Sequence, residues 1–241
     1  MFELIQTDNA STARRGRLTT AHGKIETPAF MPVGTRGTVR GVLPRDLHEV
    51  GARMILANTY HLHLRPGEET VRALGGLHAF MGWDGPLLTD SGGYQVFSLA
   101  DACEVDEDGV PFQSIVDGNT VRFTPERVVE IQATLGADVQ MAFDHCPPDP
   151  LDRAGVEAAT DRTHRWLDRC VKRHEELGGI ERGQALFGIV QGGAFDDLRR
   201  ASVDAVCSHE LAGYAIGGVS VGEEREAMYA AVNISAPALP T

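Results

Sequence analysis

The sequence predicts an α/β protein of the (β/α)8 TIM-barrel type, with about six of the eight βα units present. Short apolar runs alternate with amphipathic stretches of helical spacing, a pattern typical of parallel βαβ units. Each of the six apolar runs ends in a polar or glycine-rich pair, and functional groups at the carboxyl end of every strand are typical of this barrel. The chain of 241 residues is long enough for one domain with a sizeable core.

Six core strands are predicted, each an apolar run bounded by turn or helix signals. An open doubly wound sheet could also hold six strands, but its ligand site would gather at one switch point. A barrel needs eight, and the final SAPALPT reads as a linker after a helix, so we expect two units to be missing from this chain. The predicted strands are residues 27–33, 53–58, 86–90, 138–144, 185–191 and 213–218.

Helices are predicted between these strands from capping residues and apolar periodicity. The clearest covers residues 124–137, where Thr124 is the N-cap, Pro125 takes the first helical position and Gly136 ends the helix. Further helices are predicted over 44–51, which opens with a proline, and over 152–177 and 196–209.

Two β-hairpins are predicted outside the barrel units. Residues 1–25 form the N-terminal hairpin, and residues 101–123, with DEDG as a turn signal, form an inserted one. The sequence has no internal repeat and no low-complexity segment. We therefore predict a single partial barrel domain over residues 1–241.

Charge and composition exclude several classes of protein. The net charge of −12 argues against a protein that is basic all over and binds nucleic acid nonspecifically. Residues 14–53 nevertheless carry eight Lys/Arg against three acids, an excess of five, which leaves room for a polyanion docked at one place. A solvated face without a partner is the alternative.

The apolar runs, the N-terminus and the cysteine spacing of the sequence predict a cytoplasmic protein. No apolar run approaches the roughly 20 residues of a membrane helix, and the N-terminus lacks the order of a signal peptide. Widely spaced cysteines without a C-x-x-C pair argue against a disulfide framework and against a zinc site within the chain. They are Cys103, Cys146, Cys170 and Cys207.

The polar groups at the strand ends form the candidate site, because a barrel brings them to one pocket. Two carboxylates would repel a phosphate, whereas they suit a neutral planar ligand rich in donors and acceptors, such as a purine. One carboxylate can accept N1–H and N2–H2 of guanine, and an amide and a glycine N–H can serve O6 and N7. The residues are Asn58, Asp90, Ser91, Gly92, Gly93, Asp144, Gln191, Gly192, Gly217 and Gly218.

Two carboxylates also permit chemistry, because cleavage of an N-glycosidic bond resembles glycoside hydrolysis with a carboxylate nucleophile and a carboxyl acid/base. Other interpretations stay open for the same residues. Asp90 could belong to a turn, and the glycine pairs could be phosphate loops. His61 and His63, together with Asp144, could instead form a metal-dependent hydrolase site.

Five motifs closely resemble the tRNA-guanine transglycosylases, the queuine tRNA-ribosyltransferases of the bacterial type. They occur in order between about Phe30 and Tyr229 as ANTYHLHLRPG, LLTDSGGYQVFSL, MAFDHCPP, ALFGIVQGG and YAIGGVSVGE. The resemblance implies a TIM-barrel pentosyltransferase that exchanges the wobble guanine of tRNAs with GUN anticodons for preQ1 or queuine, on the route to queuosine. It also implies tRNA, guanine and preQ1 as partners, and a homodimer.

The resemblance assigns roles to individual residues. Asp90 corresponds to the acid/base that contacts the base, and Asp144 to the acceptor of N1–H and the exocyclic amine. Gln191 and Gly218 address the O6/N7 side, and Tyr94 covers a face of the base. Val219 and Ser220 stand where the family has a hydrophobic wall and the group near the 7-substituent. The other residues expected in the pocket are Asn58, Ser91, Gly92, Gly93 and Cys146, which fits the bacterial form.

The sequence departs from the family in one large respect. The family's nucleophile is a further aspartate on a later strand, followed by a basic RNA-binding stretch and a C-x-C-x-x-C…His zinc site. None of these occurs before Thr241, so the zinc ligands are expected beyond it, with no metal or cofactor bound by this chain. We expect a base pocket that is inactive alone, or alternatively a truncated or companion base-binding subunit.

Overall fold

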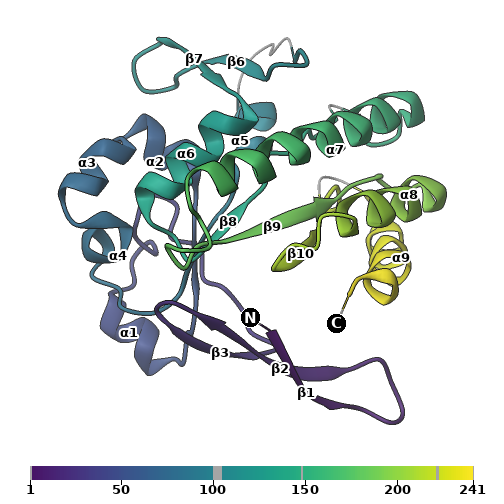
Figure 1. Cartoon of the computed structure of the whole chain (residues 1–241), viewed down its shortest axis with the longest axis horizontal. Helices are drawn as coiled ribbons and strands as arrows, with labels where there is room; N and C mark the ends of the chain where they lie inside the picture. Colours follow the sequence, from purple (N-terminus) through teal and green to yellow (C-terminus); the bar gives the residue numbers. More distant parts are fainter. Residues whose placement is uncertain (1, 100–104, 148, 221–222, 241) are drawn as a thin grey trace.

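The computed structural model describes residues 2–99, 105–147, 149–220 and 223–240 (Figure 1). Its centre is a parallel sheet with the strand order β10-β9-β8-β5-β4. Five of the six predicted strands are therefore confirmed, although most are shorter than expected. They are β4 (Ile55–Ala57), β5 (Leu87–Thr89), β8 (Val139–Met141), β9 (Ala185–Val190) and β10 (Gly213–Ile216).

The predicted strand over 27–33 is wrong as a regular strand. Only Val33 forms a parallel bridge, with Leu56 of β4, and the Leu56 N–H donates to the carbonyl of Pro32. Pro28 and Pro32 have no N–H, so this segment cannot donate a continuous ladder of hydrogen bonds. It runs beside β4 as an extended chain, and the sheet of the described residues has five regular strands.

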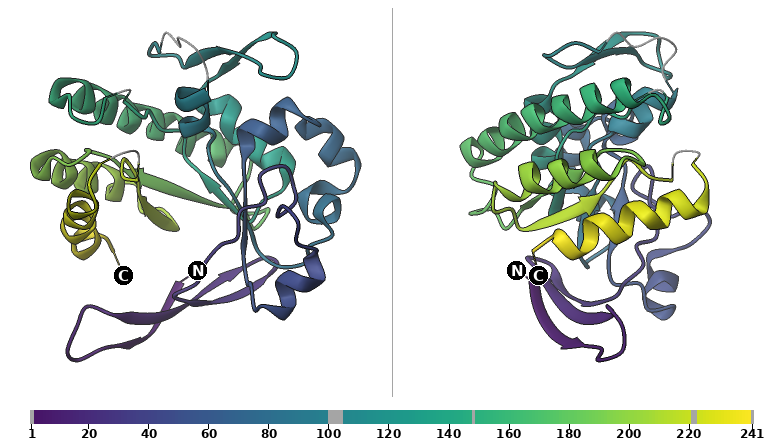
Figure 2. Two further views of the ribbon diagram at one scale, coloured as in Figure 1. Left: turned by 180° about the vertical axis from the view of Figure 1, so that it is seen from behind. Right: turned by 90° about the vertical axis from the view of Figure 1, so that its right-hand side faces the viewer.

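Three helices, α6, α7 and α8, lie along one face of the sheet, and α9 packs beside α8 (Figures 1 and 2). In α6 the Thr124 hydroxyl accepts from the Arg127 N–H at 3.1 Å and Gly136 ends the helix at a φ of 84°, so both predicted caps are confirmed. The helices are α1 (Pro44–Glu49), α6 (Pro125–Leu135), α7 (Arg153–Glu176), α8 (Asp196–Cys207) and α9 (Arg225–Ser235).

Short helices fill connections for which no helix was specified. Part of the segment predicted as a linker, Ala236–Ala238, forms a 3-10 turn. No helix of the described chain is both long and apolar enough to cross a membrane. The short helices are α2 (Thr59–Leu64), α3 (Glu68–Ala73), α4 (Gly76–Met81) and α5 (Gly93–Leu99).

Both predicted hairpins are present in modified form. The N-terminal one gains a third strand, giving the antiparallel order β1-β2-β3. In the inserted hairpin the chain reverses over residues 114–119, whereas DEDG forms a turn before the first strand; residues 101–104 of this prediction lie outside the described chain. The strands are β1 (Phe2–Thr7), β2 (Arg14–Thr20), β3 (Gly23–Thr27), β6 (Val110–Gln113) and β7 (Thr120–Phe123).

Apolar side chains cover both faces of the parallel sheet, which explains why its strands read as continuous apolar runs. The larger cluster includes Leu87, Phe143 and Trp166 and joins the sheet to its helices. A smaller cluster lies on the opposite face, toward the N-terminal sheet. It consists of Ile25, Met54, Leu88, Val139, Met141 and Ile189.

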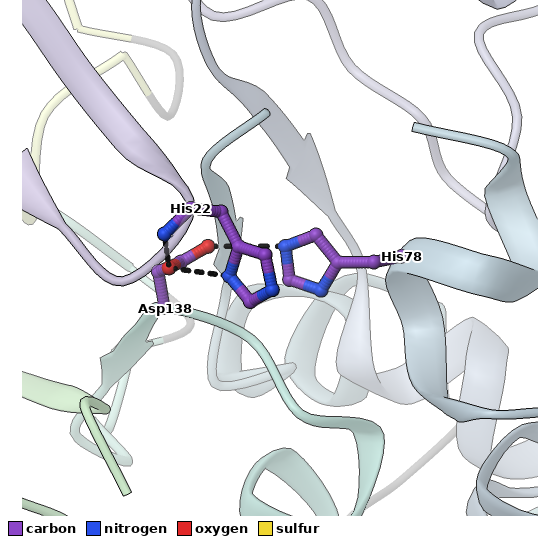
Figure 3. A group of neighbouring side chains, drawn as sticks. All are labelled: His22, His78 and Asp138. Atoms are coloured by element: carbon purple, nitrogen blue, oxygen red, sulfur yellow. Dashed lines mark hydrogen bonds and ion pairs between the residues drawn. The ribbon is translucent and has the colours of Figure 1, made fainter. Parts of the chain in front are cut away.

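Asp138, just before β8, ties the amino end of the sheet to two other elements (Figure 3). Its Oδ1 accepts from the backbone N–H of His22 at 3.1 Å and lies 2.8 Å from Nδ1 of the same residue. Its Oδ2 accepts from the Leu87 N–H at 2.9 Å and lies 3.1 Å from Nε2 of His78. Burial raises the pKa of this carboxyl, but the hydrogen bonds from His78, His22 and Leu87 outweigh burial and bring its pKa to about 2.

Candidate functional site

A cavity of about 530 Å³ lies at the carboxyl ends of the parallel strands. Its walls come from the segments that follow β5, β8 and β10, as predicted from the polar signals at the strand ends. Apolar side chains such as Met31, Leu88 and Met141 line its floor. The predicted site residues in its lining are Asp90, Ser91, Gly92, Gly93, Tyr94, Asp144, Cys146, Gly217, Gly218, Val219 and Ser220.

Three predicted residues lie outside this lining. Gly192 is buried just after β9, against the backbone of α8. Gln191 lines an adjoining cavity of about 190 Å³ that shares Tyr94, Cys146 and Gly218 with the first. Asn58 lines neither cavity; it is buried behind Asp90, to which its amide donates a hydrogen bond. The structure therefore brings the predicted set together, with Asn58 and Gly192 behind the cavity wall.

Asp90 is held by donors from two helices. The Thr59 N–H at the start of α2 donates to Oδ1 at 2.8 Å, and the Gln95 side chain in α5 donates to Oδ2 at 3.1 Å. The Asn58 amide donates to the same Oδ2. A hydrogen bond from the Thr59 hydroxyl to the Asp90 carbonyl, at 2.5 Å, fixes the backbone as well. The carboxylate consequently has one defined orientation at the end of β5.

The environment of Asp90 suits proton transfer near neutral pH. Burial raises its pKa to about 6, because desolvation and the nearby Asp144 carboxylate outweigh the hydrogen bonds from Asn58, Thr59 and Gln95. A carboxyl group with this pKa exists in both protonation states near neutrality. It can therefore serve as an acid in one step and as a base in another.

Asp144 is oriented by a different set of donors. The Ser91 hydroxyl donates to Oδ1 at 3.0 Å, and the Gln191 amide donates to Oδ2 at 2.7 Å. Burial raises the pKa of Asp144, against the hydrogen bonds from Ser91, Cys146 and Gln191. Burial also raises the pKa of the Cys146 thiol well above its usual range, so the thiol stays protonated as a weak donor to Oδ2 at 3.7 Å.

Gly93 is required where the chain passes this carboxylate. A Cβ at residue 93 would lie 2.6 Å from Oδ1 of Asp144 and 2.8 Å from its carbonyl oxygen. The two glycines of TDSGG therefore do more than form a turn, because the second one allows the start of α5 to approach Asp144 closely.

The structure adds two residues that the sequence interpretation missed and gives a third a contact that was not predicted. Thr59 and Gln95, which hold Asp90, lie inside the quoted motifs next to predicted residues and could have been inferred from that position. The role of Gln191 toward O6/N7 of the base stays a prediction, and in the structure its amide N–H2 donates to Asp144. Its contribution in this structure is to orient the second carboxylate.

The described residues do not support a metal site at His61, His63 and Asp144. His63 bonds Glu68 at 2.7 Å, and His61 packs edge-on against Tyr60. Within the described chain, the three ligating side chains that lie close enough for a cation are His22, His78 and Asp138, with ligand atoms within 4.8 Å of one another. Their mutual hydrogen bonds and stacked rings account for this cluster, which lies at the other end of the sheet (Figure 3).

Comparison with known proteins agrees with the motifs around the cavity. A family model described as queuine tRNA-ribosyltransferase matches residues 8–241. The chain belongs to this family. Curated relatives named queuine tRNA-ribosyltransferase are 54% identical over 239 residues in a Nostoc species, 55% over 238 in Synechococcus elongatus and 55% over 231 in Thermus thermophilus.

These alignments cover 99%, 98% and 96% of this chain but 63%, 61% and 59% of the respective relatives. The chain thus spans about three fifths of the length of the queuine tRNA-ribosyltransferases that it matches. In this family member, DSGGYQ follows β5, FDHC follows β8, and the glycine pairs of IVQGG and AIGG follow β9 and β10. Four of the motifs that indicated the family therefore meet at one end of the sheet.

Proposed function

We propose that this chain is the base-binding part of a tRNA-guanine transglycosylase and binds guanine or a 7-deazaguanine such as preQ1. The observation that supports this most directly is a pair of carboxylates in one cavity, Asp144 buried and Asp90 partly buried, each oriented by its own donors. The chain's membership in the queuine tRNA-ribosyltransferase family adds to this support.

In this proposal Asp144 recognises the base. Ser91 and Gln191 each occupy one of its oxygens and hold the carboxylate in a fixed orientation, and each oxygen can accept a further hydrogen bond. Guanine offers adjacent N1–H and N2–H2 donors that match such an acceptor. Gly218 serves the O6/N7 side through its backbone N–H, and the half-exposed Tyr94 covers a face of the ring at the rim of the cavity.

Asp90 moves the proton in the exchange. A nucleophilic carboxylate forms a bond to C1′ of the ribose while the bond from C1′ to N9 of guanine breaks, and the departing base takes up a proton. Asp90, with a pKa of about 6, supplies such a proton to the leaving base and removes one from the incoming base.

Asp90 and Asp144 both have roles in this scheme, so the proposal assigns the nucleophile to a further carboxylate. Residues 1–241 are accordingly proposed to bind the base without exchanging it. The complete barrel, the zinc site, the homodimer and most of the tRNA contacts are proposed for the full-length cytoplasmic enzyme, with residues 14–53 as one region that contacts tRNA.

Titration calorimetry of the chain with purines tests the binding site. Guanine and preQ1 are expected to bind at least about 100-fold more tightly than adenine, because adenine lacks the N1–H and N2–H2 donors and would leave Asp144 unpaired. Hypoxanthine, which lacks only the exocyclic amine, should lie between them. Equal affinity for adenine and guanine, or no binding of guanine, would refute the proposed pocket.

Incorporation of labelled guanine into a tRNA with a GUN anticodon tests the assignment of the nucleophile. We expect no incorporation by residues 1–241 above a reaction without protein. Measurable incorporation would show that the chain supplies its own nucleophile, and it would also exclude the alternative of an inactive companion subunit. The calorimetric result for the base pocket would stand in either case.

A further inference from the structure

Arg199, in the first turn of α8, is a buried cation directly behind the two glycine loops of the site. Its side chain has no exposed surface. The structure gives it three acceptors, all of them backbone carbonyl oxygens: Gly193 at 2.7 Å, Gly218 at 3.2 Å and Val190 at 3.4 Å. One guanidinium therefore joins the end of β9, the loop after it and the loop after β10.

The contacts around Arg199 favour this joining role over simple packing. Burial lowers its pKa to about 10, against the nearby negative charge of Glu223, so the group remains protonated at neutral pH. Its desolvation is offset by the three carbonyls and by this charge. Gly192 allows the close approach of α8, since a Cβ there would lie 2.7 Å from the Arg199 backbone nitrogen. One turn later, the Ser202 hydroxyl accepts from the Gln191 N–H at 2.9 Å.

The hydrogen bond from Arg199 to Gly218 determines which way one peptide group at the cavity faces. Because the Gly218 carbonyl points at Arg199, the N–H of the same trans peptide, which belongs to Val219, points the opposite way. Gly218 and Val219 both line the cavity. The position of Gln191, whose amide holds Asp144, depends on the same loop–helix contact.

We propose that Arg199 is a positioning residue for base binding, which clamps the loops after β9 and β10. The clamp keeps Gln191 on Asp144 and keeps the N–H of the Gly218–Val219 peptide on the side of the cavity. This inference rests on the proposed guanine site for its binding consequence. The clamp itself is a property of the two loops and can be measured without any ligand.

Three variants separate this role from general stability. Arg199→Met removes the charge and the donors but keeps most of the length, and Arg199→Lys keeps the charge with a single donor group. Arg200→Met is the matched control, because Arg200 is the next residue of α8 and is exposed. Thermal unfolding of each variant shows whether the fold is retained.

Hydrogen exchange measures the clamp. In Arg199→Met the amides of residues 191–195 and 216–220 are expected to exchange at least about tenfold faster, while those of β5 and β8 keep the wild-type rate. Arg199→Lys should be intermediate and Arg200→Met unchanged. Wild-type exchange in both loops of Arg199→Met, or equal acceleration throughout the sheet, would overturn the clamp.

Calorimetry measures the consequence for binding. Arg199→Met is expected to lose about tenfold in affinity for guanine but less for 2-aminopurine, which lacks O6 and keeps only N7 on the Gly218 side. Unchanged guanine affinity with accelerated loop exchange would overturn the positioning role. A wild type that binds no guanine would refute the proposed function instead, and the exchange data would still decide whether Arg199 clamps the loops.

Discussion

Replacement of Asp144 with asparagine is expected to weaken guanine binding by about 100-fold or more, close to 3 kcal/mol of binding free energy. The amide keeps the shape of the carboxylate but loses the charge, and it turns one acceptor into a donor that opposes N1–H or N2–H2 of the base. It also leaves either Ser91 or Gln191 without its acceptor in the buried wall. Calorimetry with guanine at pH 7 measures the loss.

The control for this variant is Asp149→Asn, an exposed position on the same loop. It should bind guanine as the wild type does. Asp144→Ala should be at least as weak as Asp144→Asn, because it offers no acceptor at all. If Asp144→Asn bound guanine with unchanged affinity while folding normally, Asp144 could not be the residue that reads the N1/N2 edge.

Replacement of Asp138 with alanine is expected to lower the free energy of unfolding by about 3 to 5 kcal/mol. The Asp138 side chain is fully buried and is the shared partner of four groups. Two are the backbone N–H groups of His22 and Leu87, and two are the rings of His22 and His78. Alanine leaves all four without this partner. Urea unfolding measures the effect. The control is Asp84→Ala, an exposed partner of His48, which should cost less than about 1 kcal/mol.

The pH dependence of the free energy of unfolding gives a second measure of the Asp138 contacts. The pKa of Asp138 is about 2 in the folded protein against an ordinary 3.8, so the ionised group stabilises the fold above about pH 4. This contribution, about 2 kcal/mol, is lost as the pH falls from about 4 to 2. Asp138→Asn should lack that part of the acid dependence. A variant with the wild-type acid profile would show that Asp138 is not the titrating group.

Local sequence signals predicted the elements that depend on neighbouring residues. The caps of α6 are an example, since Thr124 and Gly136 act within one turn of their own positions. The prediction of a strand over 27–33 was wrong. The segment is apolar, but its two prolines lack the N–H groups that a continuous hydrogen-bond ladder needs. The third N-terminal strand was missed because its pairing is decided by contact with β2 and not by its own composition.

The sequence by itself determined the family, the residue types of the candidate site and their place at successive strand ends, because a parallel sheet brings the carboxyl ends of its strands together. Only the tertiary structure decided how these residues are paired. In the structure the Gln191 amide donates to Asp144, and Thr59 and Gln95 donate to Asp90. Arg199 donates to a carbonyl of the glycine loop after β10. Such contacts join residues from different elements, and desolvation, which moves the pKa of Asp90 to about 6, arises only when those elements pack around the carboxyl group.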